Sequence, residues 1–135
     1  MKKPVKVLLI VSTVIILLFA SGIALISSSE KKLNAIAEMM IEDVDMSAVS
    51  DGTYKGEYHV FPISAKVLIT VKDHTIIKID LIKHITGQGG AADAIPGKVV
   101  EAQSLRVDAV SGATYSSKVI LLAIRDALTS PPSAE

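Results

Sequence analysis

A run of twenty residues without a charged side chain, Val7 to Ile26, constrains the fold of this chain more than any other feature. The run is rich in Val, Ile and Leu, and twenty helical residues span the hydrocarbon core of a bilayer. We therefore predict a transmembrane helix over residues 7–28. A cleaved signal peptide is the alternative, because the small residues Ala20, Gly22 and Ala24 suit a signal peptidase, although the apolar run is longer than a usual signal core.

The charges on either side of the apolar run predict its orientation. Lys2, Lys3 and Lys6, together with the terminal amine, outweigh the basic pair at 31–32 on the other side. Because the more basic flank of a membrane helix stays in the cytoplasm, residues 1–6 are expected to be cytoplasmic. The sequence thus predicts a single-pass protein of the cell membrane, with everything after the helix extracytoplasmic.

Composition narrows the remaining functions. The 135 residues contain 14 acidic and 14 basic side chains, so the chain has no net charge to favour a nucleic-acid surface. It has no cysteine, which excludes disulfides, thiolate catalysis and cysteine-ligated zinc. No metal-ligand spacing and no serine–histidine–acid set is visible. We therefore expect no independent catalytic set and no metal site, and hence no enzyme acting alone.

Residues 29–50 are predicted to form an amphipathic spacer helix that continues the anchor. Apolar residues recur at helical spacing from Leu33 to Val44, and charged and amide side chains share the opposite side. This helix could be a rigid spacer or a packing face for a neighbouring subunit. The favoured interpretation is that it covers the sheet of its own domain.

Residues 51–130 are predicted to form one small α+β domain, an antiparallel sheet with packed helices. The predicted elements are strands at 53–60, 65–72 and 75–83, helices at 91–103 and 116–128, and an extended segment at 105–110. In the third strand, Ile77, Ile79 and Leu81 are expected to face the core. Because Pro131 and Pro132 stop the last helix, residues 131–135 are predicted to be a disordered tail.

The predicted hairpin turn at Asp73-His74 lacks the glycine that a left-handed backbone favours. His74 is therefore interpreted as a tolerated turn residue and not as a ligand.

A segment dense in hydroxyl groups, Asp108-Ala109-Val110-Ser111-Gly112-Ala113-Thr114-Tyr115-Ser116-Ser117, lies where the last helix should begin. The first amides of a helix lack internal partners and lie at the positive end of the helix dipole, so they can bind a phosphate. Alternatively, a Ser or Thr simply caps the helix and nothing is bound. The carboxylate of Asp108 is expected to brace the turn.

The order of residues in this segment resembles the flavinylation motif of the FMN-binding domain family: Asp, two residues, Ser or Thr, Gly, Ala, Thr. The family includes the FMN-carrying subunits of the sodium-pumping NADH:quinone oxidoreductase and of the Rnf complex, and small membrane-anchored proteins. The resemblance implies that a flavin transferase attaches FMN to Thr114 through a phosphoester. It also implies a role for neighbouring residues, with Asp108 shaping the motif and the phosphate held by Ser111, Gly112, Ala113 and Ser116.

A second stretch, His84-Ile85-Thr86-Gly87-Gln88-Gly89-Gly90, follows the third predicted strand. Its glycine spacing matches neither a Walker loop nor a dinucleotide fingerprint, which argues against nucleotide hydrolysis. By resemblance, Thr86, Gly87 and Gly89 match a family loop that lies against the flavin. Larger members often carry Glu-Thr-Pro-Gly there, and this chain lacks that carboxylate. His84 could donate a hydrogen bond to a flavin carbonyl or simply end the strand.

Taken together, these features predict a membrane-anchored FMN protein that carries electrons outside the cytoplasm. Its expected partners are the membrane, a flavin transferase, a redox donor in the membrane and an extracytoplasmic acceptor, without nucleic acid. Two other classes remain: a module that binds or senses FMN without a covalent bond, and a flavin-free anchoring or interaction protein.

Overall fold

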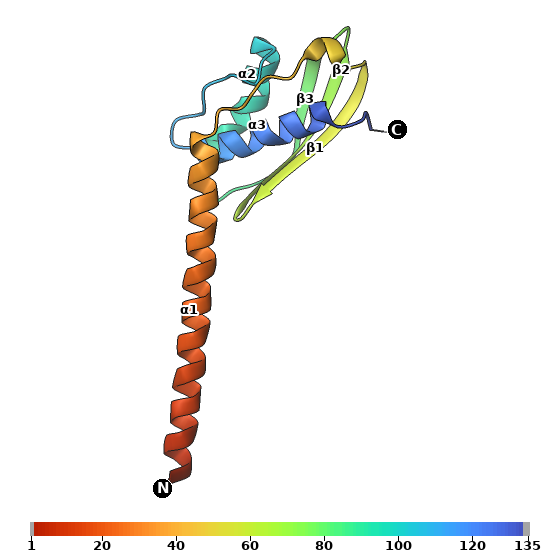
Figure 1. The fold of residues 1–135 in the computed structure, drawn as a ribbon. Helices are drawn as coiled ribbons and strands as arrows, with labels where there is room; N and C mark the ends of the chain where they lie inside the picture. Colours follow the sequence, from red (N-terminus) through yellow and green to blue (C-terminus); the bar gives the residue numbers. More distant parts are fainter. Residues whose placement is uncertain (1, 134–135) are drawn as a thin grey trace. The chain divides into compact units, whose positions relative to one another are not determined.

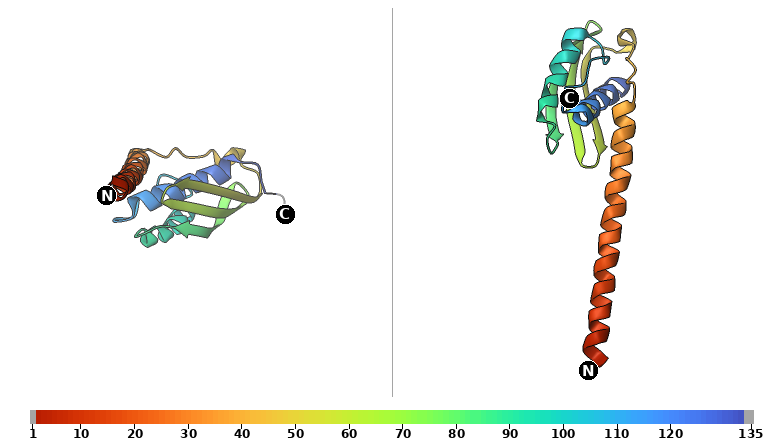
Figure 2. Two further views of the ribbon diagram at one scale, coloured as in Figure 1. Left: turned by 90° about the horizontal axis from the view of Figure 1, so that it is seen from below. Right: turned by 90° about the vertical axis from the view of Figure 1, so that its left-hand side faces the viewer.

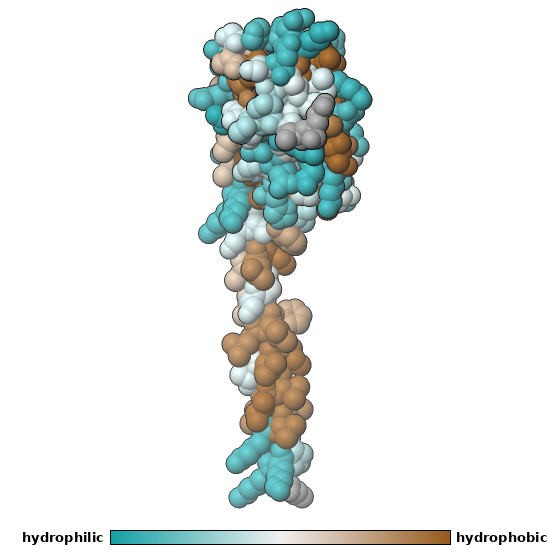
Figure 3. All heavy atoms as spheres, turned by 90° about the vertical axis from the view of Figure 1, so that its right-hand side faces the viewer, coloured by the Kyte–Doolittle hydropathy of each residue, from teal (hydrophilic) through white to brown (hydrophobic). Residues whose placement is uncertain are grey.

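Residues 2–133 are described by the computed structural model of the protein, and the chain divides into two units after Lys32. The first unit consists of helical residues of α1 (Lys2–Glu38). Its large apolar side chains from Val5 to Ile26 are exposed along the helix, which Figure 3 shows as a band of apolar atoms that follows polar atoms at the N-terminal end. As the sequence predicted, this helix is long and apolar enough to span a bilayer.

The second unit contains a three-stranded antiparallel sheet in the order β1-β2-β3 (Figure 1). The strands are β1 (Gly52–Val60), β2 (Ile63–Lys72) and β3 (Thr75–Ile85). Helix α3 (Thr114–Thr129) packs across β1 and β2, and α2 (Ile95–Ala102) packs on β3 (Figures 1 and 2). The remaining elements are the short 3₁₀ helices η1 (Met46–Ala48) and η2 (Gly90–Ala94). The predicted α+β architecture is confirmed.

The alternation of β2 sends every second side chain into the core, and the fully buried ones are Val67, Ile69 and Val71. Strand β3 departs from strict alternation because its register against β2 shifts twice, which leaves Ile77 and Ile82 without a partner. Ile76 is therefore buried, whereas Ile77 is exposed. The prediction that Ile77 faces the core is wrong, while Ile79 and Leu81 do pack against it.

The amphipathic helix predicted for residues 29–50 ends at Glu38. Beyond it, the carboxylate of Asp43 accepts hydrogen bonds from the hydroxyl of Ser104, at 2.8 Å, and from the amide of Leu105, at 2.6 Å. In the same segment, the side chain of Ile41 is buried in the domain core. Contacts to a segment about sixty residues away thus replace the helix that local periodicity favours, because they hold this part of the chain non-helical.

The turn between β2 and β3 has left-handed φ values of 51° at Asp73 and 58° at His74. Two long-range contacts stabilise it without glycine. The amide of Asp73 donates to the carboxylate of Asp51 at 2.8 Å. Nδ1 of His74 lies 3.1 Å from the carbonyl of Met46 and 2.9 Å from that of Val49, and since carbonyls only accept, this nitrogen carries the proton. His74 is thus a structural turn residue.

Asp45 begins η1 by accepting hydrogen bonds from the hydroxyl and the amide of Ser47, at 2.6 and 3.0 Å. The hydroxyl bond is the largest cause of a lowered pKa of the Asp45 carboxyl, followed by the amide bond.

The C-terminal residues that the structure describes run beside β1. The amide of Ser133 donates to the carbonyl of Thr53 at 2.7 Å, and the amide of Lys55 donates to the Ser133 hydroxyl at 3.1 Å. The prediction of disorder is therefore wrong as far as Ser133, because the free edge of β1 supplies hydrogen-bonding partners. Residues 134–135 lie outside the described residues.

Helix α3 approaches β1 most closely at Gly56. A Cβ atom at this position would overlap the backbone of Ala123 and Ala127. We expect Gly56→Ala to destabilise the domain by about 3 kcal/mol or more, because neither backbone can move aside without separating helix and sheet. Urea unfolding of the full chain in detergent, followed by circular dichroism, measures this change.

Gly97→Ala is the matched control, since a Cβ there meets nothing within 4 Å and Gly97 lies inside α2. It should leave stability unchanged or raise it by about 0.5–1 kcal/mol. Equal stabilities of the two variants would contradict the close approach at Gly56.

Candidate functional site

A tight turn leads into α3. The amide of Ala113 donates to the carbonyl of Val110 at 2.9 Å, and Gly112 has a φ of +78°. A left-handed third residue is typical of a type II turn and favours glycine. An added Cβ at Gly112 would meet nothing within 4 Å, so backbone conformation rather than packing demands the glycine. The turn leaves the start of α3 open to an approaching group.

No side chain caps the N-terminus of α3, whose N-cap residue is Ala113. The amide of Ser117 donates to the carbonyl of Ala113 at 2.9 Å. Within the described residues, the three amides before it, at 114–116, have no hydrogen-bond acceptor. The alternative in which a Ser or Thr caps this helix is therefore wrong. The free amides and the helix dipole together suit a phosphate.

Ser117 braces the turn that Asp108 was predicted to brace. Its buried hydroxyl accepts a hydrogen bond from the amide of Val110 at 3.0 Å and donates one to the carbonyl of Ala113 at 2.7 Å. Asp108 is exposed, and its carboxylate makes no hydrogen bond to the described residues. The bracing role of Asp108 is thus corrected: the hydroxyl of Ser117, in the first turn of α3, reaches both groups, which the exposed carboxylate does not.

The glycine-rich loop and the start of α3 meet through two hydroxyl groups. The hydroxyls of Thr86 and Ser116 share a hydrogen bond of 2.9 Å, and Thr86 also accepts one from the amide of Gly89 at 2.9 Å. A Cβ at Gly89 would overlap the Ser116 side chain, so the loop can lie this close to α3 only with glycine there. The structure thus brings together the two segments that resemble the FMN-binding domain family.

The four hydroxyl groups of the motif have different surroundings. Those of Ser116 and Ser117 are buried and bonded within the protein, whereas Ser111 and Thr114 are exposed. Ser116 was predicted to hold the phosphate, and its hydroxyl is bonded to the loop, so only its backbone amide is available. Thr114 is the first residue of α3 and lies beside the free amides.

His84 at the end of β3 carries the one buried side-chain polar atom without a partner among the described residues. Its side chain is 5 % exposed, and Nδ1 lies 2.7 Å from the carboxylate of Asp93 in η2. Its Nε2 atom is buried and makes no hydrogen bond. Because a buried polar atom without a partner is unfavourable, Nε2 is suited to a polar atom of a ligand. Sequence reasoning missed Asp93, since no local pattern links it to His84.

Two further contacts that the sequence did not indicate hold the first turns of α3. The hydroxyl of Tyr115 donates to the side-chain oxygen of Asn34 at 2.7 Å, and the Lys118 ammonium donates to the carbonyl of Met39 at 2.8 Å. Within the second unit, these bonds tie the start of α3 to residues 33–39. They leave Thr114 exposed.

The fold and the site define a small α+β domain with a place for a phosphate-bearing ligand. Residues 63–129 match the sequence profile of the FMN-binding domain family. This span therefore belongs to that family, and FMN is its cofactor. No curated protein matches the chain.

The residues present fit FMN. The free amides at 114–116 suit its phosphate, and Nε2 of His84 suits a polar atom of its ring. A Cβ at Gly87, in the loop after β3, or at Gly90, the first residue of η2, would meet nothing within 4 Å, so the backbone is open at both positions.

The bracing role of Ser117 predicts a specific loss of stability. Ser117→Ala leaves the partly buried amide of Val110 without this acceptor, and we expect the free energy of unfolding to fall by about 1–3 kcal/mol. Ser111→Ala removes an exposed hydroxyl of the same motif and should change it by no more than about 0.5 kcal/mol. Urea unfolding of both variants makes the comparison, and equal effects would show that the turn does not depend on Ser117.

Proposed function

We propose that this protein is a membrane-anchored flavoprotein whose FMN is attached covalently to Thr114 and which carries electrons outside the cytoplasm. The observation that carries the proposal is the position of Thr114, an exposed hydroxyl at the uncapped start of α3. The neighbouring hydroxyls of Ser116 and Ser117 are bonded within the protein and are therefore unsuited to modification.

The attachment step needs a phosphate that arrives activated. The donor is a flavin phosphoanhydride. The Thr114 oxygen forms an ester bond to the FMN phosphorus, and the bond from that phosphorus to the bridging oxygen of the anhydride breaks. The second phosphate group leaves with the bridging oxygen and takes up the hydroxyl proton. A flavin transferase performs this reaction. Once attached, the phosphate lies where the free amides at 114–116 and the exposed hydroxyl of Ser111 can donate to it. The open turn at Gly112 admits it.

The ring of FMN supplies one- and two-electron chemistry when bound, and the protein supplies position and polarity. The loop from Thr86 to Gly89 is held against α3 by the hydrogen bond between Thr86 and Ser116. The loop therefore offers the ring a surface of fixed position to pack against. At the end of β3, Nε2 of His84 is available to a polar ring atom, while Asp93 fixes the opposite side of the imidazole. The chain needs no catalytic set of its own to act as a carrier.

The anchor supports a function at the membrane. Helix α1 is long and apolar enough to span it, and the lysines before the apolar run favour a cytoplasmic N-terminus. The domain is then extracytoplasmic, where free FMN is scarce and a covalent bond prevents its loss. Eight residues lead from Ile26 to Asn34, which is bonded to Tyr115, and a fully extended chain of this length covers at most about 28 Å. This short link supports an electron donor in the membrane and an extracytoplasmic acceptor.

Substitution of Thr114 tests the attachment. When the protein is produced together with a flavin transferase, Thr114→Ala should abolish the fluorescent flavin band after denaturing electrophoresis and remove the FMN mass from the intact protein. Thr129→Ala, an exposed threonine at the other end of α3, should keep both signals.

A covalent flavin signal that persists in Thr114→Ala would rule out this attachment site. Flavin absorbance that survives gel filtration of the unsubstituted protein but is lost on denaturation would instead indicate a module that binds FMN without a covalent bond.

The proposed contact between His84 and the ring predicts a local spectroscopic change. In protein labelled with ¹⁵N at its three histidines, FMN should move the Nε2 resonance of His84, because this atom gains a hydrogen bond. The exposed His59 serves as the internal control and should not respond. An unchanged His84 resonance in the FMN-loaded protein would leave His84 as a residue that only ends the strand.

A further inference from the structure

One end of the sheet exposes large apolar side chains. At the turn between β1 and β2, Phe61 is 65 % exposed. Ile85, at the end of β3, pairs with Ser64 and is 48 % exposed, and Ile82 is an unpaired residue of β3 that is 58 % exposed. The strand register therefore gathers these three side chains within a few residues of the same end. Burial in the domain core accounts for none of them.

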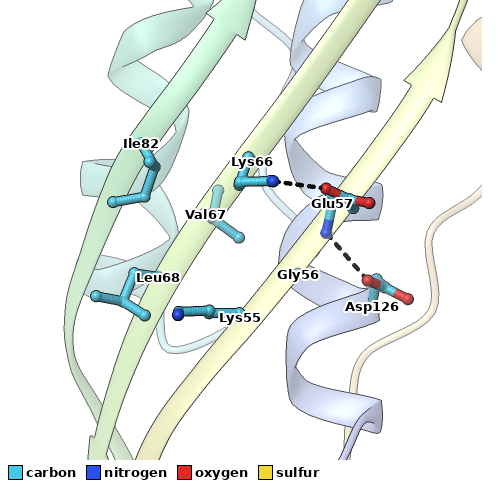
Figure 4. A pocket seen from close by; sticks show the side chains of 8 residues that line it. All are labelled: Lys55, Gly56, Glu57, Lys66, Val67, Leu68, Ile82 and Asp126. Atoms are coloured by element: carbon cyan, nitrogen blue, oxygen red, sulfur yellow. Dashed lines mark hydrogen bonds and ion pairs between the residues drawn. The ribbon is translucent and has the colours of Figure 1, made fainter. Parts of the chain in front are cut away.

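Lysines lie beside these apolar groups on the open face of the sheet. Lys66 and Lys83 are directly paired across β2 and β3, and like charges opposite each other destabilise a sheet. Glu57 lies 3.0 Å from the ammonium of Lys66 (Figure 4), and within the described residues no carboxylate pairs with Lys83 or Lys55. Of the two paired lysines, Lys83 is therefore the one whose ammonium is free for an anionic partner outside the chain.

The other end of the sheet has the opposite charge. Acidic side chains at positions 45, 51 and 73 lie in and around the turn between β2 and β3, where they outnumber the lysine at position 72. Acidic residues also outnumber basic ones in residues 33–135 as a whole. An anionic surface would thus repel most of this unit and attract the end that carries Lys66 and Lys83.

We propose that this end of the sheet, the sheet tip formed by Phe61, Lys66, Ile82, Lys83 and Ile85, docks onto the surface of an anionic phospholipid bilayer. Lysine ammonium groups bind lipid phosphates, and their stems lie along apolar surface. Phe61 and the two isoleucines enter the boundary between headgroups and acyl chains. A bilayer is favoured over a protein partner because the anchor holds the domain at high effective concentration beside it. The inference rests on the membrane anchor of the proposed function.

Docking of the sheet tip would determine what reaches the flavin. Ile85 directly precedes Thr86, the first residue of the loop that meets α3. An Ile85 side chain at the headgroup level therefore places this loop at the membrane surface. The electron donor is then of a lipid-soluble class that diffuses within the bilayer.

Tryptophan reporters test the docking, because the chain contains no tryptophan. We place Phe61→Trp and, as the matched control, Ile77→Trp into the full-length protein, each at an exposed position of the sheet. Flavin-free protein is inserted into vesicles of phosphatidylcholine and phosphatidylglycerol that contain brominated lipids. The tryptophan at 61 should lose most of its emission and shift to the blue, whereas that at 77 keeps its emission. Circular dichroism confirms that both variants are folded.

A second set of measurements tests whether docking requires the lysine charges. Lys66→Glu with Lys83→Glu in the Phe61→Trp protein should reduce the quenching, as should vesicles without phosphatidylglycerol. High salt should do the same, because the Debye length falls from about 10 Å at 0.1 M to about 3 Å at 1 M. Equal quenching at 61 and 77, or quenching at 61 that ignores charge and salt, would overturn the proposal. If the tryptophan at 61 is not quenched, docking onto the bilayer is refuted, and an acidic protein becomes the partner that fits the lysines.

The outcome does not depend on flavin attachment. Thr114→Ala should leave the quenching at 61 unchanged, because the sheet tip does not include the attachment site. Loss of the flavin band with quenching intact would therefore refute only the covalent carrier, and loss of quenching with the band intact would refute only the docking.

Discussion

The contact between α3 and the sheet at Gly56 determines where the site forms. Glycine at position 56 lets the backbone of Ala123 and Ala127 lie directly on β1, where any Cβ atom would keep helix and sheet apart. The first turn of α3 then meets the loop that follows β3, where the hydroxyls of Thr86 and Ser116 share a hydrogen bond. The proposed phosphate site at the start of α3 and the proposed ring site at the loop both depend on this packing.

Burial assigns different roles to chemically similar groups in the motif. Ser117 braces the turn before α3 by bonding to Val110 and Ala113, and Ser116 connects the helix to the loop. Because these hydroxyls satisfy protein groups, the amides at 114–116 stay free and Thr114 stays exposed. The site therefore combines a buried side with an exposed polar side, which suits a ligand that is held at its phosphate.

Local sequence patterns predicted the strands and helices of the domain well, but predicted strand register and helix ends less well. Alternation located β2 and its core residues, since each side chain depends only on its neighbours along the strand. The unpaired residues Ile77 and Ile82 of β3 follow from register against another strand, and the early end of α1 at Glu38 follows from contacts of Asp43 with Leu105. These features depend on partners far along the chain, which periodicity does not contain.

By itself the sequence determined the apolar helix, the α+β class and the family resemblance of the hydroxyl motif, because each is written in consecutive residues. Only the tertiary structure decided which hydroxyls are occupied, that Asp93 binds His84, and that no side chain caps α3. The physical reason is that a hydrogen bond such as that between Thr86 and Ser116 joins residues thirty positions apart. Its existence depends on how the sheet and α3 pack, and no local pattern specifies that packing.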